Sequence, residues 1–229
     1  MDVHSTHLAV VSGGGDETDD LFDLSRGEFQ GTAFPLAPHL GLFLTACHVY
    51  DAAAAHGSVA VGRIMTTPKQ IVLVDDAERF PDIDLAILSC NGLRADPMPF
   101  NFRTLSYLDN VAACGFPFGV TIAANGPHTQ ILRAFKGNIV TRRELSELGG
   151  CPPGYEVSFP APPGLSGAPL LSLATQEPSV VGVILQQHSA ELGDRRMDLG
   201  LALDIQAVYS IQSRLAGKAV GQLFDVKPK

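Results

Sequence analysis

The clearest chemistry in this chain lies in the sequence PGLSGAP at positions 163–169. Glycines and prolines around a serine disfavour helix and strand and favour a tight turn. Gly164 and Gly167 permit positive φ, which lets backbone N–H groups converge beside the Ser166 hydroxyl. Convergent N–H groups are what an oxyanion hole requires, and those of Gly164 and Ser166 are the candidates. The same letters also suit an ordinary surface turn, so the motif alone leaves both interpretations open.

A serine hydroxyl is a weak nucleophile at its own pKa and needs an adjacent base. His48, at the end of an apolar run, is the candidate base. Asp84 opens the run DLAIL at 84–88 and is the candidate carboxylate that fixes the imidazole tautomer, a role that favours a buried position inside a strand. Asp82, one strand period earlier, is an alternative, and a turn-capping role for Asp84 also stays open. The order histidine, aspartate, serine differs from that of α/β-hydrolases.

With these motifs, the chain resembles the trypsin/chymotrypsin-like serine peptidases over residues 30–215, in the minimal branch without disulfides that includes HtrA-type proteases. The resemblance rests on LTACHV at 44–49, DLAIL at 84–88, VAACGFPFG at 111–119 and the serine loop. It implies an all-β fold of two six-stranded antiparallel β-barrels with a short C-terminal helix. It also implies a bacterial serine endopeptidase that works through an acyl-enzyme, without metal or organic cofactor.

The specificity pocket is implied by the same resemblance. Counting back six residues from Ser166, as the family does for the base of the pocket, leads to a proline and not to an acidic residue. The implied substrate-binding residues are Pro160, Ala161, Leu185, Gln186 and Gln187. They indicate a small or uncharged residue before the scissile bond. His188, next to this wall, is either a cation that selects an acidic residue or a surface loop histidine.

Strand-like runs must position these residues. They recur between turns at 31–45, 58–75, 110–115, 130–140, 155–159 and 169–187. We therefore expect one peptidase domain over 26–217, with the two barrels meeting near 100–110, since all-β domains often reach ~200–250 residues.

The two ends of the chain are expected to differ from this domain. Glycines and like charges over 1–25 predict a flexible, solvated acidic arm. Apolar spacing predicts an amphipathic helix over 205–215, with Asp204 as N-cap and Gly217 as its stop. Residues 218–229 are expected to form a tail.

Composition limits the partners. Twenty-four acidic residues against 16 basic ones give a net charge of −8 and disfavour nucleic acid or an anionic membrane as partner. No apolar run is long enough to span a bilayer, and the start of the chain has no secretory signal pattern. The four cysteines and the histidines lack metal-site spacing. We expect buried free thiols and a reducing, cytoplasmic compartment.

The sequence therefore predicts a serine endopeptidase with a narrow set of protein or peptide substrates, and with an activating or inhibiting protein partner as a further expectation. A catalytically silent module that binds a peptide by strand addition is the alternative. An esterase is disfavoured by the residue order and by Ala168, which stands where a nucleophile elbow has glycine.

Overall fold

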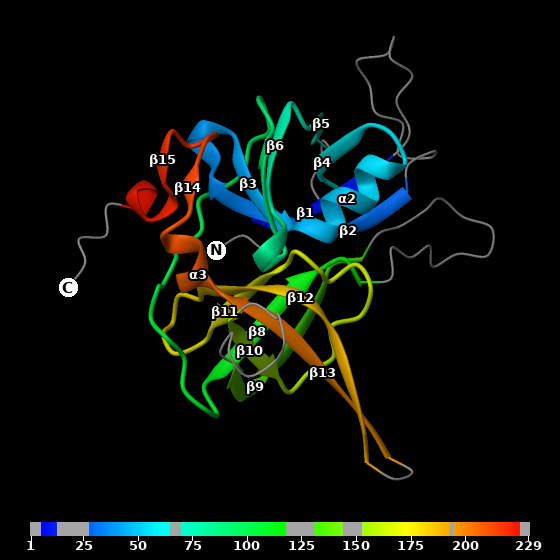
Figure 1. The fold of residues 1–229 in the computed structure, drawn as a ribbon, viewed down its shortest axis with the longest axis vertical. Coiled ribbons are helices and arrows are strands. Elements are labelled where there is room, and N and C mark those ends of the chain that lie inside the picture. Colours follow the sequence, from blue (N-terminus) through cyan, green and yellow to red (C-terminus); the bar gives the residue numbers. More distant parts are fainter. Residues whose placement is uncertain are drawn as a thin grey trace.

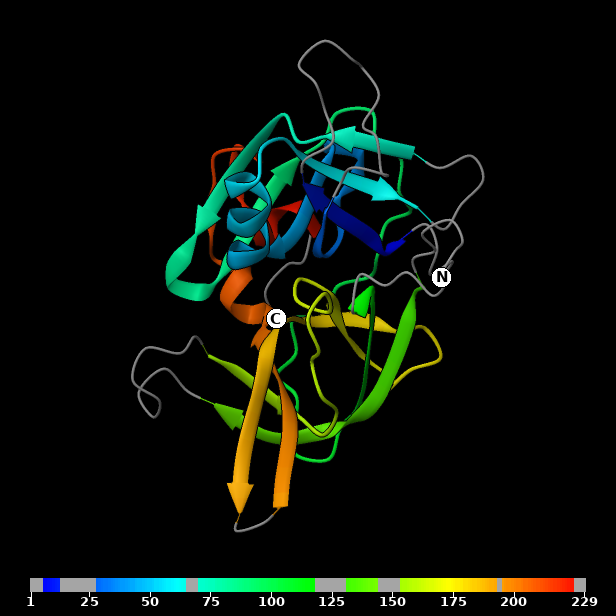
Figure 2. The same ribbon diagram turned by 90° about the vertical axis from the view of Figure 1, so that its right-hand side faces the viewer.

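The computed structural model describes residues 6–12, 28–64, 70–117, 131–143, 153–192 and 195–224. Two antiparallel sheets, stacked one above the other in Figures 1 and 2, make up the fold. The first has seven strands in the order β5-β4-β1-β2-β3-β7-β6 and curls into a half-barrel. Its strands are β1 (Leu8–Ser12), β2 (Glu28–Ala37), β3 (Leu42–Ala46), β4 (Val59–Arg63), β5 (Gln70–Leu73), β6 (Asp76–Phe80) and β7 (Leu85–Ser89).

The second sheet is a closed barrel of six strands in the order β10-β13-β12-β11-β8-β9. Its strands are β8 (Asn110–Gly115), β9 (Arg133–Arg143), β10 (Gly154–Val157), β11 (Pro169–Ser172), β12 (Ser179–Leu192) and β13 (Arg195–Asp204). The predicted all-β, chymotrypsin-like fold is confirmed. The difference is that only the second unit is a closed six-stranded barrel, whereas the first is a curled sheet with one strand more.

The additional strand comes from the predicted acidic arm, and for these residues the arm prediction is wrong. β1 lies between β2 and β4, and Leu8 to Val11 are at most 1% exposed. A short run that is apolar throughout suits a strand covered on both faces, and here the nearby glycines and charges outweighed that signal in the sequence. Those glycines and charges, in 13–25, lie outside the described residues.

The C-terminal helix is shorter than predicted. Asp204 caps α3 (Ile205–Tyr209) as expected, because its Oδ1 accepts the Gln206 N–H at 2.9 Å. The chain then leaves the helical path and forms a small hairpin, β14 (Gln212–Ser213) with β15 (Lys218–Ala219). The turn of this hairpin is held by the Glu78 carboxylate of β6, which accepts the N–H groups of Arg214 at 2.9 Å and Leu215 at 3.2 Å.

The predicted tail is also folded over its first part. Val220 begins the 3₁₀ segment η4 (Val220–Phe224) and is fully buried. At its end the Phe224 ring lies 4.4 Å, centroid to centroid, from Phe100 in the segment that joins β7 to β8. That segment contains the predicted boundary near 100–110, so the C-terminus packs against the link between the two units.

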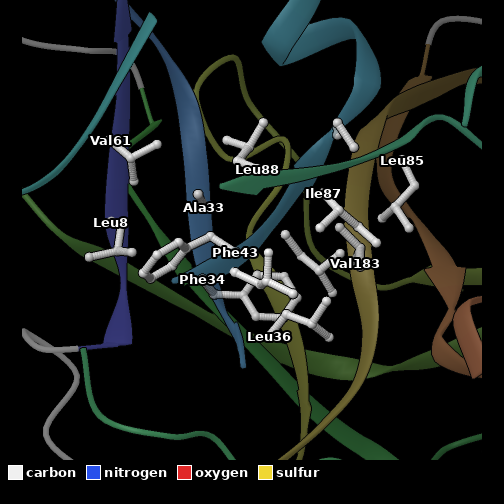
Figure 3. Close-up of a cluster of buried hydrophobic side chains, with 14 of the residues drawn as sticks. Leu8, Ala33, Phe34, Leu36, Phe43, Val61, Leu85, Ile87, Leu88 and Val183 are labelled. Atoms are coloured by element: carbon white, nitrogen blue, oxygen red, sulfur yellow. The ribbon is translucent and has the colours of Figure 1, made fainter. Parts of the chain in front are cut away.

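One hydrophobic cluster connects the half-barrel to the barrel. It combines Leu8, Phe34, Phe43 and Ile87 of the half-barrel with Val183 of β12 (Figure 3). A second cluster fills the barrel itself and includes Tyr155, Val157, Ile139 and Leu170. Because the first cluster takes side chains from both sheets, burial of apolar surface fixes the units against each other. None of the helices in the described ranges has the length and apolarity that crossing a membrane requires.

Candidate active site

His48 and Asp84 meet at the start of helix α2 (Cys47–Ala55). The His48 Nδ1 and the Asp84 Oδ2 are 2.7 Å apart, and the His48 backbone N–H donates to Asp84 Oδ1 at 3.0 Å. The Cys47 N–H donates to the Asp84 carbonyl oxygen at 3.1 Å. The first N–H groups of a helix have no acceptor within it, and a carboxylate there is favoured by the helix dipole. Asp84 therefore caps the helix that carries His48 and contacts the imidazole as well.

Asp84 does not lie inside a strand, contrary to the expectation from the sequence. It is the left-handed residue (φ 52°, ψ 47°) that ends the 3₁₀ turn η2 (Pro81–Ile83), directly before β7. Its side chain is 29% exposed, so it is partly buried at the surface end of the strand and not enclosed within the sheet. This turn directs the Asp84 carboxylate toward α2. The residues of β7 that follow are paired with strands on both sides, and their side chains point to the faces of the sheet. The competing Asp82 is exposed within η2, and Asp84 is the aspartate that contacts His48.

Ser166 lies in a turn that only glycine can complete. Gly164 and Gly167 have φ values of 91° and 83°. A Cβ on Gly164 would collide with the carbonyl oxygen of Phe116, and one on Gly167 with that of Thr32. Ser166 itself is 9% exposed. The turn therefore packs closely between the barrel and the half-barrel. Residues larger than glycine do not fit at positions 164 and 167.

Two backbone N–H groups of this turn differ from those of their neighbours. Within the described residues, no acceptor is recorded for the N–H of Gly164 or of Ser166. Their neighbours are paired, Leu165 N–H with the Pro162 carbonyl at 3.0 Å and Gly167 N–H with the Ile184 carbonyl at 2.7 Å. Buried N–H groups are rarely left without a partner, so two of them in one turn indicate a site for a negatively charged oxygen.

The serine turn adjoins the segment that leads to His48. A Cβ on Gly167 would lie 3.1 Å from the Ala46 backbone nitrogen, two residues before the imidazole. Within the described residues, the His48 ring bonds Asp84, and no hydrogen bond joins it to the Ser166 hydroxyl. The structure therefore places the serine turn beside the segment that leads to His48, and the histidine and aspartate are in direct contact.

An open hollow of about 350 Å³ lies beside these residues. It is lined by Cys47, His48, Asp51, Pro81, Asp84 and Gln186. Gln186 comes from β12, where the register to β13 shifts between Ile184 and Gln186. Leu185 is the extra residue of this β-bulge, and bulges redirect neighbouring side chains. Of the predicted substrate-binding residues, Gln186 is the one that the structure places in the hollow.

The other predicted pocket residues lie in different surroundings. Pro160 is exposed and Gln187 is half-buried, whereas Ala161 is buried inside the barrel. A Cβ on Gly200 would lie 3.4 Å from the Ala161 Cβ and 2.9 Å from the Phe159 carbonyl oxygen. The Leu185 side chain is 6% exposed and packs into the core that both sheets share. The Leu185 side chain therefore lies in this core and not in the hollow.

Comparison with known proteins places the chain in a family. The family model described as "Trypsin-like peptidase domain" matches residues 31–183, more than half of the chain. The chain belongs to the trypsin-like peptidase family. No curated protein gives a significant match.

Solved structures of similar fold are bacterial and HtrA-type proteases. The active form of the Rv3671c protease from M. tuberculosis is 18% identical, with a TM-score of 0.63, and the match covers 99% of this chain and 84% of that one. An inactive form, a serine-to-alanine mutant, is 19% identical with a TM-score of 0.61, covering 99% and 90%. The HtrA-type protease AlgW, solved with a decapeptide, is 18% identical with a TM-score of 0.61, covering 89% of this chain and 62% of its own. At such identities the likeness concerns the fold.

His188 of this trypsin-like peptidase domain lies on strand β12 and not in a surface loop, which corrects one of the two interpretations. Its Nδ1 is 3.6 Å from Glu156 Oε1, and the buried Arg143 places its Nε 3.7 Å from the same oxygen. The neighbouring Glu156 carboxylate would offset the positive charge that a protonated His188 presents to a substrate. This contact therefore weakens the other interpretation, in which His188 selects an acidic substrate residue.

The cysteines described are free thiols, buried at Cys47 and Cys90 and half-buried at Cys114. Burial, together with the Asp75 charge, raises the pKa of Cys90 to about 12. Burial also raises the pKa of Cys47, which lines the hollow beside His48. A protonated thiol is a poor nucleophile, and burial favours the protonated form of Cys47. The described residues contain no cluster of histidine, cysteine and acidic side chains that suits a metal ion.

One residue of the site was missed in the sequence. Thr32 of β2 is fully buried and bonds the serine turn through its hydroxyl and its N–H. The available signal was a hydroxyl residue inside the otherwise apolar stretch that opens the first sheet. Sequence patterns do not reveal the contact itself, because its partners are more than 80 residues away.

Proposed function

We propose that this trypsin-like peptidase domain is a serine endopeptidase in which Ser166 is the nucleophile, His48 the base and Asp84 the residue that orients the imidazole. The observation that supports this most directly is the paired contact of Asp84 with the Nδ1 and the backbone N–H of His48. With Nδ1 as donor to a carboxylate, the neutral imidazole has its lone pair on Nε2, the nitrogen that takes a proton from a serine.

The reaction then has two halves. The Ser166 hydroxyl attacks the carbonyl carbon of the scissile bond while His48 Nε2 accepts its proton, and the oxyanion is stabilised by the N–H groups of Gly164 and Ser166. The imidazolium returns the proton to the leaving amine, which leaves an acyl-enzyme. Water, deprotonated by the same histidine, attacks the ester and regenerates the hydroxyl. Asp84 stays ionised throughout.

Substrates are proposed to be proteins or peptides with a small or uncharged residue before the scissile bond. No acidic side chain occupies position 160, and the residue that β12 contributes to the hollow, Gln186, is uncharged. AlgW, one of the similar structures, was solved with a peptide. By extension we propose a peptide here, lying along β12 where Gln186 reaches the hollow. The narrow target set, the protein regulator and the cytoplasmic location remain predictions.

A fluorophosphonate probe, which reacts with activated serines, tests the proposal. The wild-type protein should be labelled, and Ser166→Ala should not. Turnover of a peptide found by library cleavage should fall by roughly 10⁴–10⁶ in Ser166→Ala, by a similar factor in His48→Ala, and no further in the double variant, because the residues act as a unit.

Labelling at another serine would contradict the assignment of Ser166. A folded wild-type protein that is neither labelled nor active, yet binds library peptides, would instead identify the alternative, a silent peptide-binding module.

A further inference from the structure

We propose that Thr32 is a positioning residue that holds the oxyanion hole open from the opposite sheet. This inference rests on the proposed peptidase function. Thr32 lies in β2 of the half-barrel, whereas the serine turn belongs to the barrel. It is 0% exposed, so its polar atoms have no access to water and must find partners within the protein.

Every polar group of Thr32 is paired. Its hydroxyl donates to the Gly164 carbonyl at 2.8 Å and accepts the Phe116 N–H at 3.1 Å. Its backbone N–H donates to the Ser166 carbonyl at 2.9 Å. Its own carbonyl accepts the Thr45 hydroxyl at 2.8 Å, which connects it to the end of β3 just before His48. Thr32 thus contacts both ends of the segment 164–166 and the strand that leads to the base.

These contacts fix the peptide plane that carries the Ser166 N–H and the planes on either side of it. The plane after Gly164 is held by the Thr32 hydroxyl on its carbonyl, and the plane after Ser166 by the Thr32 N–H on its carbonyl. The plane between them is held by the Ala168 N–H, which donates to the Leu165 carbonyl at 3.0 Å. Carbonyl oxygens are thereby turned toward the protein, and the N–H groups of Gly164 and Ser166 remain for the oxyanion.

The Gly164 end depends on the hydroxyl in particular. Gly164 has φ 91° and approaches the Phe116 carbonyl so closely that no side chain fits. A glycine has a wide choice of backbone conformations, so steric exclusion alone does not prevent its peptide from rotating. The Thr32 hydroxyl bonds Gly164 and Phe116 at once and holds them in this close contact. Without it, the Gly164 carbonyl loses the hydrogen bond from Thr32, and the peptide plane that precedes the one carrying the Ser166 N–H loses a constraint.

The test compares Thr32→Val, which keeps the shape and removes the hydroxyl, with Thr32→Ser, which keeps the hydroxyl. Loss of an oxyanion donor costs roughly 10²–10³ in rate, and for a donor that is displaced but not removed we expect a kcat roughly 10- to 100-fold lower with KM nearly unchanged. Affinity for a peptide boronic acid, whose adduct places an oxygen in the hole, should fall by a similar factor. Thr32→Ser should restore most of both.

Tyr155→Phe is the matched control. The Tyr155 hydroxyl is also buried, accepts a backbone N–H (Leu105, 3.1 Å) and donates to an acceptor (Asp204 Oδ2, 2.7 Å), and neither partner belongs to the serine turn. Its loss should lower the melting temperature without changing kcat. Thr32→Ala supplies a second hydroxyl-free variant if Thr32→Val does not fold.

The outcomes separate the two proposals. An unlabelled wild type would refute the peptidase function, independently of Thr32. An active wild type with Thr32→Val or Thr32→Ala at wild-type kcat, or with a loss that Tyr155→Phe reproduces, would overturn the positioning role alone. A raised KM at constant kcat would also overturn it, because an oxyanion effect is confined to the transition state.

Discussion

The half-barrel and the barrel each contribute to the site, and they hold their residues by different means. In the half-barrel, His48 and Asp84 are joined by hydrogen bonds at a helix start, and their side chains are 47% and 29% exposed. In the barrel, Ser166 is 9% exposed and its turn has no space for side chains at its glycines. Polar contacts position the base, whereas the turn of the nucleophile is held by steric exclusion at its glycines together with the hydrogen bonds from Thr32.

This difference predicts different sensitivities. A contact made by hydrogen bonds fails when one acceptor or donor changes, even if the shape is kept. A turn fixed by exclusion fails when volume is added, even if no polar group changes. Substitutions that keep shape should therefore act on the half-barrel side of the site, and substitutions that add one methyl group should act on the barrel side.

Asp84→Asn is expected to have the largest effect in this comparison. The amide keeps the shape of the carboxylate but stabilises the wrong imidazole tautomer, which costs about 10⁴ in kcat in a triad of this type. Steady-state kinetics on a library-derived peptide would measure the loss. Asp82→Asn, two residues away and exposed in η2, is the matched control and should behave as wild type. If the two variants had equal activity, the Asp84–His48 contact would have no role in turnover.

The same comparison explains what the sequence could and could not predict. DLAIL predicted β7 correctly, because its apolar residues form a buried strand. The left-handed turn at Asp84 was not foreseen, since a non-glycine residue with positive φ is uncommon and is chosen here by the three hydrogen bonds to α2. The alternative left open for Asp84 was the capping of a turn; in the structure its carboxylate instead accepts an N–H group at the start of α2 and also contacts the imidazole.

On the barrel side, the glycine turn was predictable from its composition, because positive φ and close packing both exclude other residues. What composition does not show is the partner across the junction. Thr32, Phe116 and Gly164 meet only after both sheets have formed, and no local pattern connects them. The strand β1 was missed for a related reason, since its partners β2 and β4 lie far beyond a glycine-rich acidic segment.

Gly164→Ala tests the barrel side. The added methyl group would collide with the Phe116 carbonyl. The alanine would also have to adopt the φ of 91° that Gly164 has, which is unfavourable for a residue with a Cβ. We expect kcat to fall by roughly 10²–10³, as when one oxyanion donor is lost. Gly92→Ala is the control, because Gly92 has a similar φ of 87° but nothing within 4 Å of an added Cβ. It isolates the backbone strain, about 1 kcal/mol, from the collision. Thermal unfolding and kcat, measured for both variants, separate the backbone strain from the collision. If Gly164→Ala and Gly92→Ala lost the same stability and the same kcat, the argument that steric exclusion holds the serine turn would be refuted.

The smallest expected effect concerns how the half-barrel holds the end of the chain. Glu78 accepts hydrogen bonds from the Ser213 hydroxyl at 2.8 Å, the Arg214 N–H at 2.9 Å and the Leu215 N–H at 3.2 Å. Burial alone would raise the pKa of Glu78, but these bonds, with the Arg214 charge, lower it below its usual 4.5. A carboxyl group whose pKa is lower in the folded state stabilises the fold above the unfolded pKa, and that contribution is lost as pH falls through the folded value.

Glu78→Gln should therefore lower the free energy of unfolding by about 1 kcal/mol at pH 7, a small value because the carboxylate is partly exposed. The gap to wild type should narrow as pH falls below about 4.5 and close once Glu78 is protonated in the folded state as well. Denaturant unfolding at pH 7, 5 and below 4 would measure this.

Glu177→Gln is the control. Glu177 is an exposed glutamate whose side chain makes no hydrogen bond within the described residues, and its replacement should show no such difference from wild type. A gap that stayed constant with pH would mean that shape, and not the charge of Glu78, anchors the C-terminal hairpin, and the half-barrel would then resemble the barrel in how it is held.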